Sequence, residues 1–433
     1  MTFEKLRAAH PIFTYEGYEY RVTDGILYIR FDFKIGDNIR FQPEMSLEGT
    51  QYVAYPDDLT TLEGFIFNIG MIELISYWKC CCCPEIHIRP YRLDEDQQFW
   101  WKKLYWNGLG EFYYRNHLQC LPDDFLHFTF DENAPHYQSL NFVKSELSDR
   151  VIVPIGGGKD SVVTLEELRV HREVIPFIIN PRGATIDCAR IAGFEMPQQV
   201  LVLHREIAPR LLELNREGYL NGHTPFSAML AFYTTLLSAV TGVRDVALSN
   251  ESSANEPTIP GTYINHQYSK SLEFEEDFRD YVQTYMGDCN HYFSYLRPLT
   301  ELQIAEKFAR YPQYFKVFKS CNAGSKENKW CCNCPKCLFA YIILSPFIDD
   351  ATMIDIFGED LLNKAELSQT FEELAGLSLN KPFECVGTIG EVNQALRMLC
   401  QSRGDKYLIK HYINLTLAQL EDGMLEEYFN MAP

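Results

Sequence analysis

The sequence has no apolar run that we read as long enough to cross a membrane, since a spanning helix needs about 20 consecutive apolar residues. Its first residues, Met1-Thr2-Phe3-Glu4-Lys5, also lack the apolar segment of a secretory signal. The composition, 46% hydrophobic and 23% charged, is typical of a soluble globular chain. We therefore expect a cytoplasmic protein without a membrane partner.

Basic residues are in the minority. The chain has 39 lysines and arginines against 59 aspartates and glutamates, which gives a formal net charge of −20. Nucleic-acid binding draws most of its affinity from basic side chains that neutralise phosphates. The charge therefore argues against a tRNA or DNA partner. Small anionic substrates need only a few well-placed cations and stay compatible with it.

Internal repeats and low-complexity tracts are absent, and the 14 cysteines are not spread as a disulfide framework. They gather in clusters, which suits a reducing compartment. A chain of 433 residues can bury a large core and is expected to hold two or three domains.

Changes of pattern along the chain predict four regions. We expect a β-rich α+β N-terminal domain at residues 1–120, a polar connector at 121–148, an α/β domain at 149–345 and a helical region at 346–433. In the first region, two alternating stretches flank Thr23-Asp24-Gly25, which is a hairpin signal.

Strand and helix patterns alternate from residue 150 onward, as is typical of a parallel sheet covered by helices. The elements expected here are strands at 151–155, 174–179, 200–203 and 245–248, and a buried helix at 225–240. We predict a doubly wound α/β fold with a parallel sheet. In such sheets the ligand lies at the carboxyl ends of the strands.

A glycine-rich stretch, Gly156-Gly157-Gly158-Lys159-Asp160-Ser161, stands where the first of these strands meets a helix. Three glycines let backbone N–H groups approach an anion with no Cβ in the way. The start of the helix adds unpaired N–H groups and a positive dipole end, and Lys159 adds a full charge. The stretch therefore predicts a phosphate-binding loop.

Two common phosphate loops fit this stretch poorly. The P-loop of NTPases requires a glycine where Val153 stands and Ser or Thr where Asp160 stands. The dinucleotide fingerprint is nearly met, but it wants an acidic residue at the end of the second strand, where Asn180 stands.

The pattern instead resembles the pyrophosphate loop of the N-type ATP pyrophosphatases, whose usual first residue, Ser, is replaced here by Gly156. The resemblance implies a PP-loop domain of the adenine nucleotide alpha-hydrolase type at 149–345, which cleaves ATP between the α and β phosphates. Lys159 and Mg²⁺ would neutralise the leaving pyrophosphate, and Asp160 would hold the Mg²⁺ directly or through water. The expected ATP-binding residues are Gly156, Gly157, Gly158, Lys159, Asp160, Ser161, Asn180, Ser249 and Asn250.

Four cysteines beyond the sheet have spacings that can close a tetrahedral Zn²⁺ site. They are Cys321, Cys331, Cys334 and Cys337. Their pattern resembles that of 7-cyano-7-deazaguanine synthase, and a closed four-thiolate site would be structural; Cys332 is an extra thiol. By contrast, Cys80-Cys81-Cys82-Cys83 has no metal-ligand spacing, and we interpret it as a buried strand.

Further motifs accompany the glycine loop and Cys334-Pro-Lys-Cys. They are Leu93-Asp-Glu-Asp-Gln-Gln through Gly108-Leu-Gly-Glu-Phe, Leu248-Ser-Asn-Glu-Ser-Ser-Ala-Asn-Glu, Asn265-His-Gln-Tyr-Ser-Lys-Ser and Lys381-Pro-Phe-Glu-Cys-Val-Gly-Thr. With these motifs, the whole length of the chain resembles the UDP-N-acetylmuramoyl-L-alanyl-L-glutamate epimerase (MurL) family.

This resemblance implies an isomerase of peptidoglycan precursor synthesis. The terminal L-Glu of UDP-MurNAc-L-Ala-L-Glu, a nucleotide-sugar peptide, would become D-Glu with release of AMP and pyrophosphate. Adenylation makes chemical sense, because the negative charge of a free carboxylate opposes a carbanion at the α-carbon. The activated residue could also cyclise to an oxazolone, whose α-hydrogen is more acidic still.

Polar residues near the expected sheet edge and in later loops are candidates for this chemistry, since Cys, His and Glu act as general bases when their pKa is tuned. The predicted catalytic residues are Lys159, Asp160, Glu251, His266 and Cys385. The predicted substrate-binding residues are Arg182, Asn255, Glu256, Lys270 and Arg297.

Other functions stay open on the sequence alone. An ATP-pyrophosphatase-type ligase that forms an amide or nitrile, or a thiolase acting on tRNA, would use the same loop, although the acidic charge disfavours tRNA. A module that binds ATP without cleaving it is a further interpretation, for which Gly156 in place of Ser is the one indication.

Overall fold

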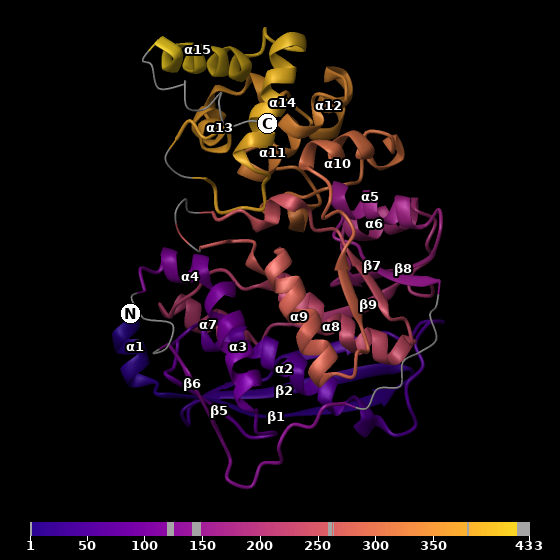
Figure 1. Ribbon diagram of the computed structural model, residues 1–433, viewed down its shortest axis with the longest axis vertical. Helices are drawn as coiled ribbons and strands as arrows, with labels where there is room; N and C mark the ends of the chain where they lie inside the picture. The colour runs from indigo at the N-terminus through magenta and orange to yellow at the C-terminus, as the bar shows by residue number, and fades with distance from the viewer. Residues whose placement is uncertain are drawn as a thin grey trace.

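An eleven-stranded sheet runs through the computed structural model, which describes residues 2–118, 125–140, 149–258, 262, 264–378 and 381–421 (Figure 1). The strands follow the order β11-β10-β7-β8-β9-β4-β2-β1-β5-β6, and β3 pairs with β2 beside this path. Their bounds are β1 Ile12–Thr23, β2 Ile26–Ile35, β3 Ile39–Phe41, β4 Glu44–Leu47, β5 Glu85–Ile88, β6 His127–Phe130, β7 Arg150–Pro154, β8 Glu173–Ile179, β9 Leu201–Glu206, β10 Asp245–Leu248 and β11 His291–Ser294.

Five neighbouring strands, β11, β10, β7, β8 and β9, form a parallel half of the sheet. The sequence predicts four of them, and β11 at the edge was not predicted. The chain moves outward from β7 through β8 to β9 and then crosses back to place β10 on the other side of β7. Ligands of open α/β sheets bind where the strand order reverses, which here lies between β7 and β10. The α/β class is confirmed, and its assignment to the PP-loop type stays a prediction.

The N-terminal strands continue the same sheet. β4 pairs antiparallel with β9, with Leu47 opposite Leu203 and Met45 opposite Arg205. The regions expected as separate domains at 1–120 and 149–345 are therefore joined by backbone hydrogen bonds.

The segment 121–148, expected as a connector, also contributes to the sheet: its His-Phe-Thr-Phe run forms β6, parallel to β5 at the edge. A connector alone is thus the wrong interpretation of residues 127–130, whose alternating pattern suits an edge strand. Residues 121–124 and 141–148 of this region, 119–120 before it, and 422–433 of the expected helical region lie outside the described residues.

The predicted hairpin is confirmed. β1 and β2 pair antiparallel up to Thr23 and Ile26, and the turn residues Asp24 and Gly25 have φ of 53° and 75°. Positive φ at both central positions is what a two-residue type I′ turn requires.

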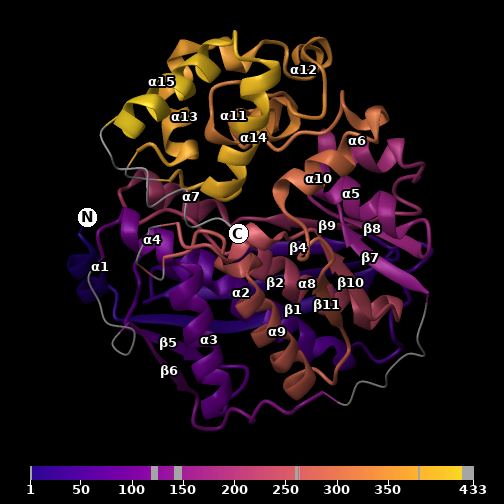
Figure 2. The ribbon, with the colours of Figure 1, turned by 45° about the horizontal axis from the view of Figure 1, so that its top comes forward.

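Helices cover both faces of the parallel half (Figure 2). Along β7, Ile152 packs into one core with α8 and α9, whereas Val151 and Val153 pack into a second core with α5 and α10. The helices are α1 Phe3–Ala9, α2 Glu63–Trp78, α3 Glu95–Gly108, α4 Gly110–Arg115, α5 Lys159–Leu168, α6 Ala184–Ile191, α7 Pro209–Arg216, α8 Phe226–Thr241, α9 Leu272–Tyr285, α10 Glu301–Phe308, α11 Pro335–Leu344, α12 Asp350–Phe357, α13 Ser368–Ala375, α14 Ile389–Ser402 and α15 Tyr407–Glu421.

The C-terminal helices α11 to α15 gather above the parallel half, next to α10 (Figure 1). The predicted helical character of the last region is confirmed for its described residues.

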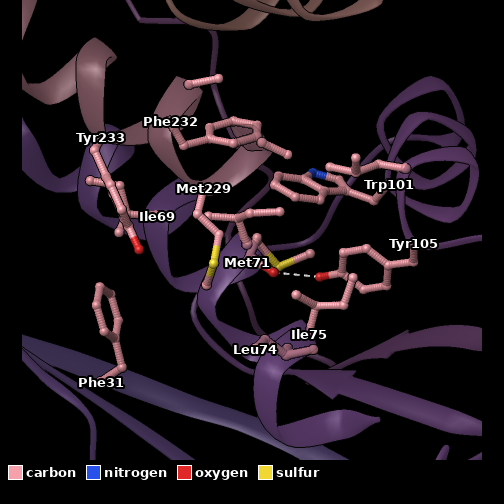
Figure 3. Packing of buried hydrophobic residues seen from close by; sticks show 14 of the residues in the cluster. Phe31, Ile69, Met71, Leu74, Ile75, Trp101, Tyr105, Met229, Phe232 and Tyr233 are labelled. Carbon is pink, nitrogen blue, oxygen red and sulfur yellow. Dashed lines mark hydrogen bonds between the residues drawn. The ribbon is translucent and has the colours of Figure 1, made fainter. Parts of the chain in front are cut away.

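Helix α2 corrects the expectation about apolar length. With the turn before it, Leu59–Trp78 is long and apolar enough by length and composition to span a membrane, the one such helix among the described residues. It lies inside the protein: Met71 faces Met229 of α8, and Ile75 lies beside the ring of Tyr105 (Figure 3). The helix is apolar all round because it is covered on every side.

The four consecutive cysteines follow α2. They are buried, as predicted, but Cys80 to Cys82 form a turn rather than a strand. Cys82 has a φ of 51°, and the indole N–H of Trp78 donates to the Cys83 carbonyl at 2.9 Å. The turn reverses the chain at the end of α2, so that β5 can run back along the sheet.

A buried ion pair reinforces the junction of the two sheet halves. The Arg205 guanidinium of β9 donates to both carboxylate oxygens of Glu73 on α2, at 2.7 and 2.8 Å. Glu73 is 0% exposed and also accepts from the Tyr233 hydroxyl of α8.

Removing one partner of this pair should strongly destabilise the fold. We expect Arg205→Met to lower the free energy of unfolding by about 3–5 kcal/mol, because it leaves the Glu73 charge buried without a cation. Urea denaturation followed by circular dichroism measures the change. Arg30→Ala, which breaks the exposed 2.8 Å pair with Glu19, is the control, with a cost below about 1 kcal/mol. Equal effects of the two variants would contradict the assignment.

Candidate active site

A cavity of about 520 Å³ opens at the carboxyl ends of β7, β8 and β10, where the strand order reverses. This is the position at which open α/β sheets bind ligands. Its lining includes these predicted site residues: Gly156, Gly158, Lys159, Asp160, Ser161, Asn180, Arg182, Ser249, Asn250, Lys270 and Cys385.

The glycine loop joins β7 to α5 beside this cavity. Gly157 has a φ of 81°, and a Cβ there would lie 2.9 Å from Ala184, so both the turn and the packing require glycine. A Cβ on Gly156 would meet nothing within 4 Å. Gly158 is the N-cap of α5 and has no side chain that caps the helix. The first N–H groups of α5 are therefore suited to bind an anion.

Lys159 is buried and ion-paired with two carboxylates, those of Asp160 and Glu301. Burial raises the pKa of Glu301, and the charges of Asp160 and Glu251 raise it further, against the opposing effect of Lys159. Glu301 begins α10 and lines the cavity. This carboxylate was missed in the sequence, because a capping box hides it as an ordinary first-turn residue.

Two of the predicted ATP-binding side chains have partners in the sheet. The Asn180 amide exchanges hydrogen bonds with the Arg205 backbone at 2.8 and 3.0 Å, and Asn250 donates to the Ser294 hydroxyl at 3.0 Å. The Ser249 hydroxyl is buried with no protein partner. Since a buried polar group is costly without a hydrogen bond, Ser249 fits a site for a polar ligand.

The structure does not bring three of the predicted substrate-binding side chains to the cavity. The Asn255 amide oxygen accepts from the Leu272 N–H at the start of α9. Glu256 pairs with Lys381 at 2.6 Å. The Arg297 guanidinium holds backbone carbonyls, including that of Lys270 at 2.7 Å. These side chains shape the loops around the site.

Two predicted catalytic residues lie next to the cavity without appearing in its lining. Glu251 is buried and accepts from the Ser253 hydroxyl at 3.0 Å. His266 lies behind Cys385, which itself lines the cavity and is half-buried.

Cys385, His266 and Glu111 lie next to one another. The Nδ1 atom of His266 contacts Glu111 Oε2, and the ring is close enough to the Cys385 thiol for each to shift the pKa of the other. Glu111 comes from α4, His266 from the segment after β10, and Cys385 from the segment between α13 and α14. The arrangement of nucleophile, base and orienting carboxylate is that of a catalytic triad.

The charges at this triad favour a thiolate–imidazolium pair. Burial raises the pKa of the Cys385 thiol. The opposing effects of Lys270, of the interaction with His266 and of Lys336 are larger and lower this pKa to about 6. Burial lowers the pKa of His266. Its interactions with Cys385 and Glu111 outweigh burial and raise this pKa to about 9. At neutral pH the thiol is ionised, and a thiolate is both a base and a strong nucleophile.

Glu111 is held in place from its other side. Its Oε1 atom pairs with Arg115 at 2.5 Å, and His223 Nδ1 lies 3.5 Å from its Oε2 atom. Burial and the neighbouring His266 lower the pKa of His223 to about 3, so this ring is neutral. Glu111, His223 and His266 are close enough to hold a metal ion, but the Arg115 cation already occupies the carboxylate.

Glu111 was missed as a site residue in the sequence, although it lies in the Gly108-Leu-Gly-Glu-Phe stretch that carries the family resemblance. The stretch does pack in the core, and the signal that could have found Glu111 is a carboxylate in an otherwise apolar helical run, since such a group is rarely buried without a partner.

Besides Lys159, four cations line the cavity in a protein of net charge −20, namely Arg182, Lys270, Lys319 and Lys336. Burial lowers the pKa of Lys270. The charges of Cys385, Glu251 and Asp160 outweigh burial and raise this pKa, so the Lys270 side chain stays charged. These cations, with the N-terminus of α5, suit an anionic ligand. Lys319 and Lys336 were not identified from the sequence.

The predicted metal-ligating cysteines come together beside the cavity, which Cys321 also lines. The sulfur of Cys334 lies 3.9 Å from that of Cys321 and 3.5 Å from that of Cys337, and Cys331 and Cys337 are 3.7 Å apart. A tetrahedral zinc with Zn–S bonds of about 2.3 Å sets its sulfurs roughly 3.8 Å apart. The four residues therefore fit zinc, whereas Cys332 points away to the Phe357 carbonyl.

Two family models match the chain, the MurL N-terminal domain over residues 4–295 and the MurL C-terminal domain over residues 317–423. The chain belongs to the MurL family. The resemblance predicted from the motifs is confirmed, as is the enzyme class, an isomerase of the epimerase type.

Curated relatives agree with the family models. The chain is 34% identical over 394 residues to a Xanthomonas oryzae pv. oryzae protein named UDP-N-acetyl-alpha-D-muramoyl-L-alanyl-L-glutamate epimerase, covering 88% of this chain and 85% of the relative. A protein of the same name from Salinispora tropica is 34% identical, with 80% and 75% covered. One from a Micromonospora species is also 34% identical, with 80% and 77% covered.

Metal analysis should find zinc on the four cysteines. We expect freshly purified protein to carry close to one zinc ion per chain. Cys337→Ser should lose the metal, because it removes one thiolate of the tetrad, whereas Cys332→Ser should retain it, since this thiol points to Phe357. Absence of zinc from the unmodified protein, or its full retention in Cys337→Ser, would remove the site.

Alkylation should reveal the ionised Cys385 thiol. With iodoacetamide, its rate should be half-maximal near pH 6 and level above neutral pH. His266→Asn should move the midpoint upward, because it removes an interaction that stabilises the thiolate. Peptide mass spectrometry also reads Cys400 in the same sample, a thiol whose pKa burial raises and which should react only at higher pH. Identical profiles for the two thiols would contradict the triad.

Proposed function

We propose that this chain converts the terminal L-Glu of UDP-N-acetyl-alpha-D-muramoyl-L-alanyl-L-glutamate to D-Glu in peptidoglycan precursor synthesis, in the cytoplasm, with consumption of ATP. The family membership supports the epimerisation. The observation that carries the ATP dependence is one cavity, lined both by the Gly156–Ser161 loop and by Cys385 of the triad. An activating group and a proton-transfer group thus face the same ligand.

Adenylation is assigned to the glycine loop. The N–H groups at the start of α5 would hold the pyrophosphate end of ATP, and Lys159 would neutralise the charge that develops on it. Asp160 would hold Mg²⁺, which supplies further charge neutralisation on the phosphates when bound. The uncapped helix and the open space beside Gly156 support this assignment.

Activation of the carboxylate prepares the α-carbon for proton loss. A free glutamyl carboxylate opposes a neighbouring carbanion, whereas its adenylate is uncharged at the acyl carbon and withdraws electrons. The triad of Cys385, His266 and Glu111 is the source of the base, because it is the thiolate–imidazolium group at the cavity.

The cations around the cavity would bind the acidic substrate. Lys319, Lys336 and Arg182 all line it and lie apart from the pair that Lys159 makes with Asp160 and Glu301. The four-cysteine cluster would have a structural role, since a zinc ion bound by four thiolates has no open position for substrate.

Product analysis tests the reaction. Incubation with UDP-MurNAc-L-Ala-L-Glu, ATP and Mg²⁺ should give AMP, pyrophosphate and a D-glutamyl product, and the glutamyl α-hydrogen should exchange in D₂O. Chiral chromatography after acid hydrolysis reads the glutamate, and ³¹P NMR reads the nucleotide. Formation of ADP, or an amide product with no D-glutamate, would overturn the proposal.

Asp160→Ala should reduce pyrophosphate release by about 10²-fold or more, because it removes a charged group at the phosphates. Asp355→Ala, at an exposed carboxylate of α12 that pairs with Lys316, is the matched control and should leave the rate unchanged. Normal turnover of Asp160→Ala would show that the loop has a different role.

A further inference from the structure

The Cys385 thiol lies between the two chemical parts of the site. It lines the cavity together with the glycine loop, and the His266 ring, which is not part of the lining, lies next to the thiol. Among the described cysteines outside the four-cysteine cluster, Cys385 and Cys400 are those that are not fully buried, and of the two only Cys385 lines this cavity. Its thiol can therefore meet the ligand directly.

The proposed reaction needs more than proton transfer at the α-carbon. An acyl adenylate must also be converted back to a free carboxylate before the product can leave. Acyl transfer and hydrolysis are carried out by a nucleophile with a base beside it and a carboxylate that orients the base. Cys385, His266 and Glu111 make this arrangement at the cavity wall.

We propose that Cys385 accepts the glutamyl group from the adenylate, so that epimerisation and hydrolysis take place on a thioester; this inference rests on the proposed function. The Cys385 sulfur attacks the acyl carbon, the carbon–sulfur bond forms, and the bond from that carbon to the phosphate oxygen breaks. AMP leaves with the electron pair of that bond. No oxidant or reductant takes part.

A thioester retains what the adenylate provides. Its carbonyl withdraws electrons, so the α-hydrogen stays acidic after AMP has left, and the covalent bond holds the substrate during the change of configuration. The α-carbon is then two bonds from the sulfur that His266 contacts, which brings the α-hydrogen within reach of the ring. Acylation also removes the negative charge of Cys385, one of the two beside His266, which lowers the pKa of the ring so that it can release its proton to solvent and act as a base.

Lys270 is placed to assist the same step. It lines the cavity together with Cys385, whose charge helps to raise the pKa of Lys270, and it follows His266 by four residues in the segment that leads into α9. When the α-hydrogen leaves to His266, its electron pair moves onto the thioester carbonyl oxygen, and a neighbouring cation stabilises the resulting enolate. A proton from solvent then adds to the opposite face of the α-carbon, the carbonyl re-forms on the D-glutamyl thioester, and His266 releases the proton it took to solvent.

Hydrolysis completes the cycle. Water attacks the thioester carbon, a carbon–oxygen bond forms, and the carbon–sulfur bond breaks to release the carboxylate and the Cys385 thiolate. One proton of the water restores the His266 imidazolium, and the other is released to solvent. Glu111 is a positioning residue here, since it contacts the His266 ring rather than the ligand.

Trapping of labelled protein tests the thioester. The full-length enzyme is mixed with UDP-MurNAc-L-Ala-L-Glu carrying ¹⁴C in the glutamate, ATP and Mg²⁺, then quenched in acid at times within the first turnover. We expect label bound to denatured protein that neutral hydroxylamine releases, and peptide mass spectrometry should locate it at Cys385. In Cys385→Ala the bound label and the D-glutamyl product should both be lost.

A second measurement separates this inference from the proposed function. Exchange of labelled pyrophosphate into ATP, dependent on the substrate, reports adenylation alone and should persist in Cys385→Ala, which also shows that the variant is folded. Cys400→Ala is the matched control and should retain bound label, product and exchange.

Three outcomes decide between the possibilities. Pyrophosphate exchange and D-glutamate formation with no bound label on the unmodified enzyme would overturn the thioester and leave adenylation standing. Label that persists in Cys385→Ala would overturn the assignment to this cysteine. Absence of exchange in every variant would overturn the proposed function itself.

Discussion

The antiparallel pairing of β4 with β9 is the constraint on which the rest of the structure depends. It turns an N-terminal β-rich region and a parallel sheet into one continuous sheet. The pair between Glu73 and Arg205 reinforces the same junction, and it is costly to break because the Glu73 carboxylate is fully buried. Because the two halves are held together in this way, α4 can present Glu111 to a histidine more than 150 residues later in the chain.

The cavity is lined by positive charges, whereas the molecule as a whole is negatively charged. A protein of net charge −20 gathers lysines and an arginine around one cavity and adds the N-terminus of α5. Buried cations are costly unless they are balanced, and Lys159 is balanced by Asp160 and Glu301. The same local field favours the thiolate of Cys385, since Lys270 and Lys336 both stabilise its negative charge. Anion binding and thiol activation therefore have a common origin.

The four-cysteine cluster connects the C-terminal region to the positively charged cavity. Cys321 lines the cavity itself, and Lys336 lies between two cysteines whose sulfurs are 3.5 Å apart. A metal that fixes these sulfurs also fixes the loop that carries the lysine. The following segment returns past the cavity between α13 and α14 and brings Cys385 to it. The C-terminal helices thus contribute a wall of the site as well as a core of their own.

The sequence by itself determined the local elements of this protein: four of the five strands of the parallel half, the hairpin at Asp24 and Gly25, the glycine loop and the cysteine spacing. Each depends on neighbouring residues, through side-chain alternation, backbone freedom or ligand spacing. Its motifs also identified the family. Only the tertiary structure decided that β6 and the N-terminal strands extend the same sheet, that Cys80 to Cys82 form a turn, and that Arg297 supports a loop. It also brought Glu111, His266 and Cys385 together from three distant segments. Contacts of this kind depend on strand pairing and packing across the whole chain, which no local pattern specifies.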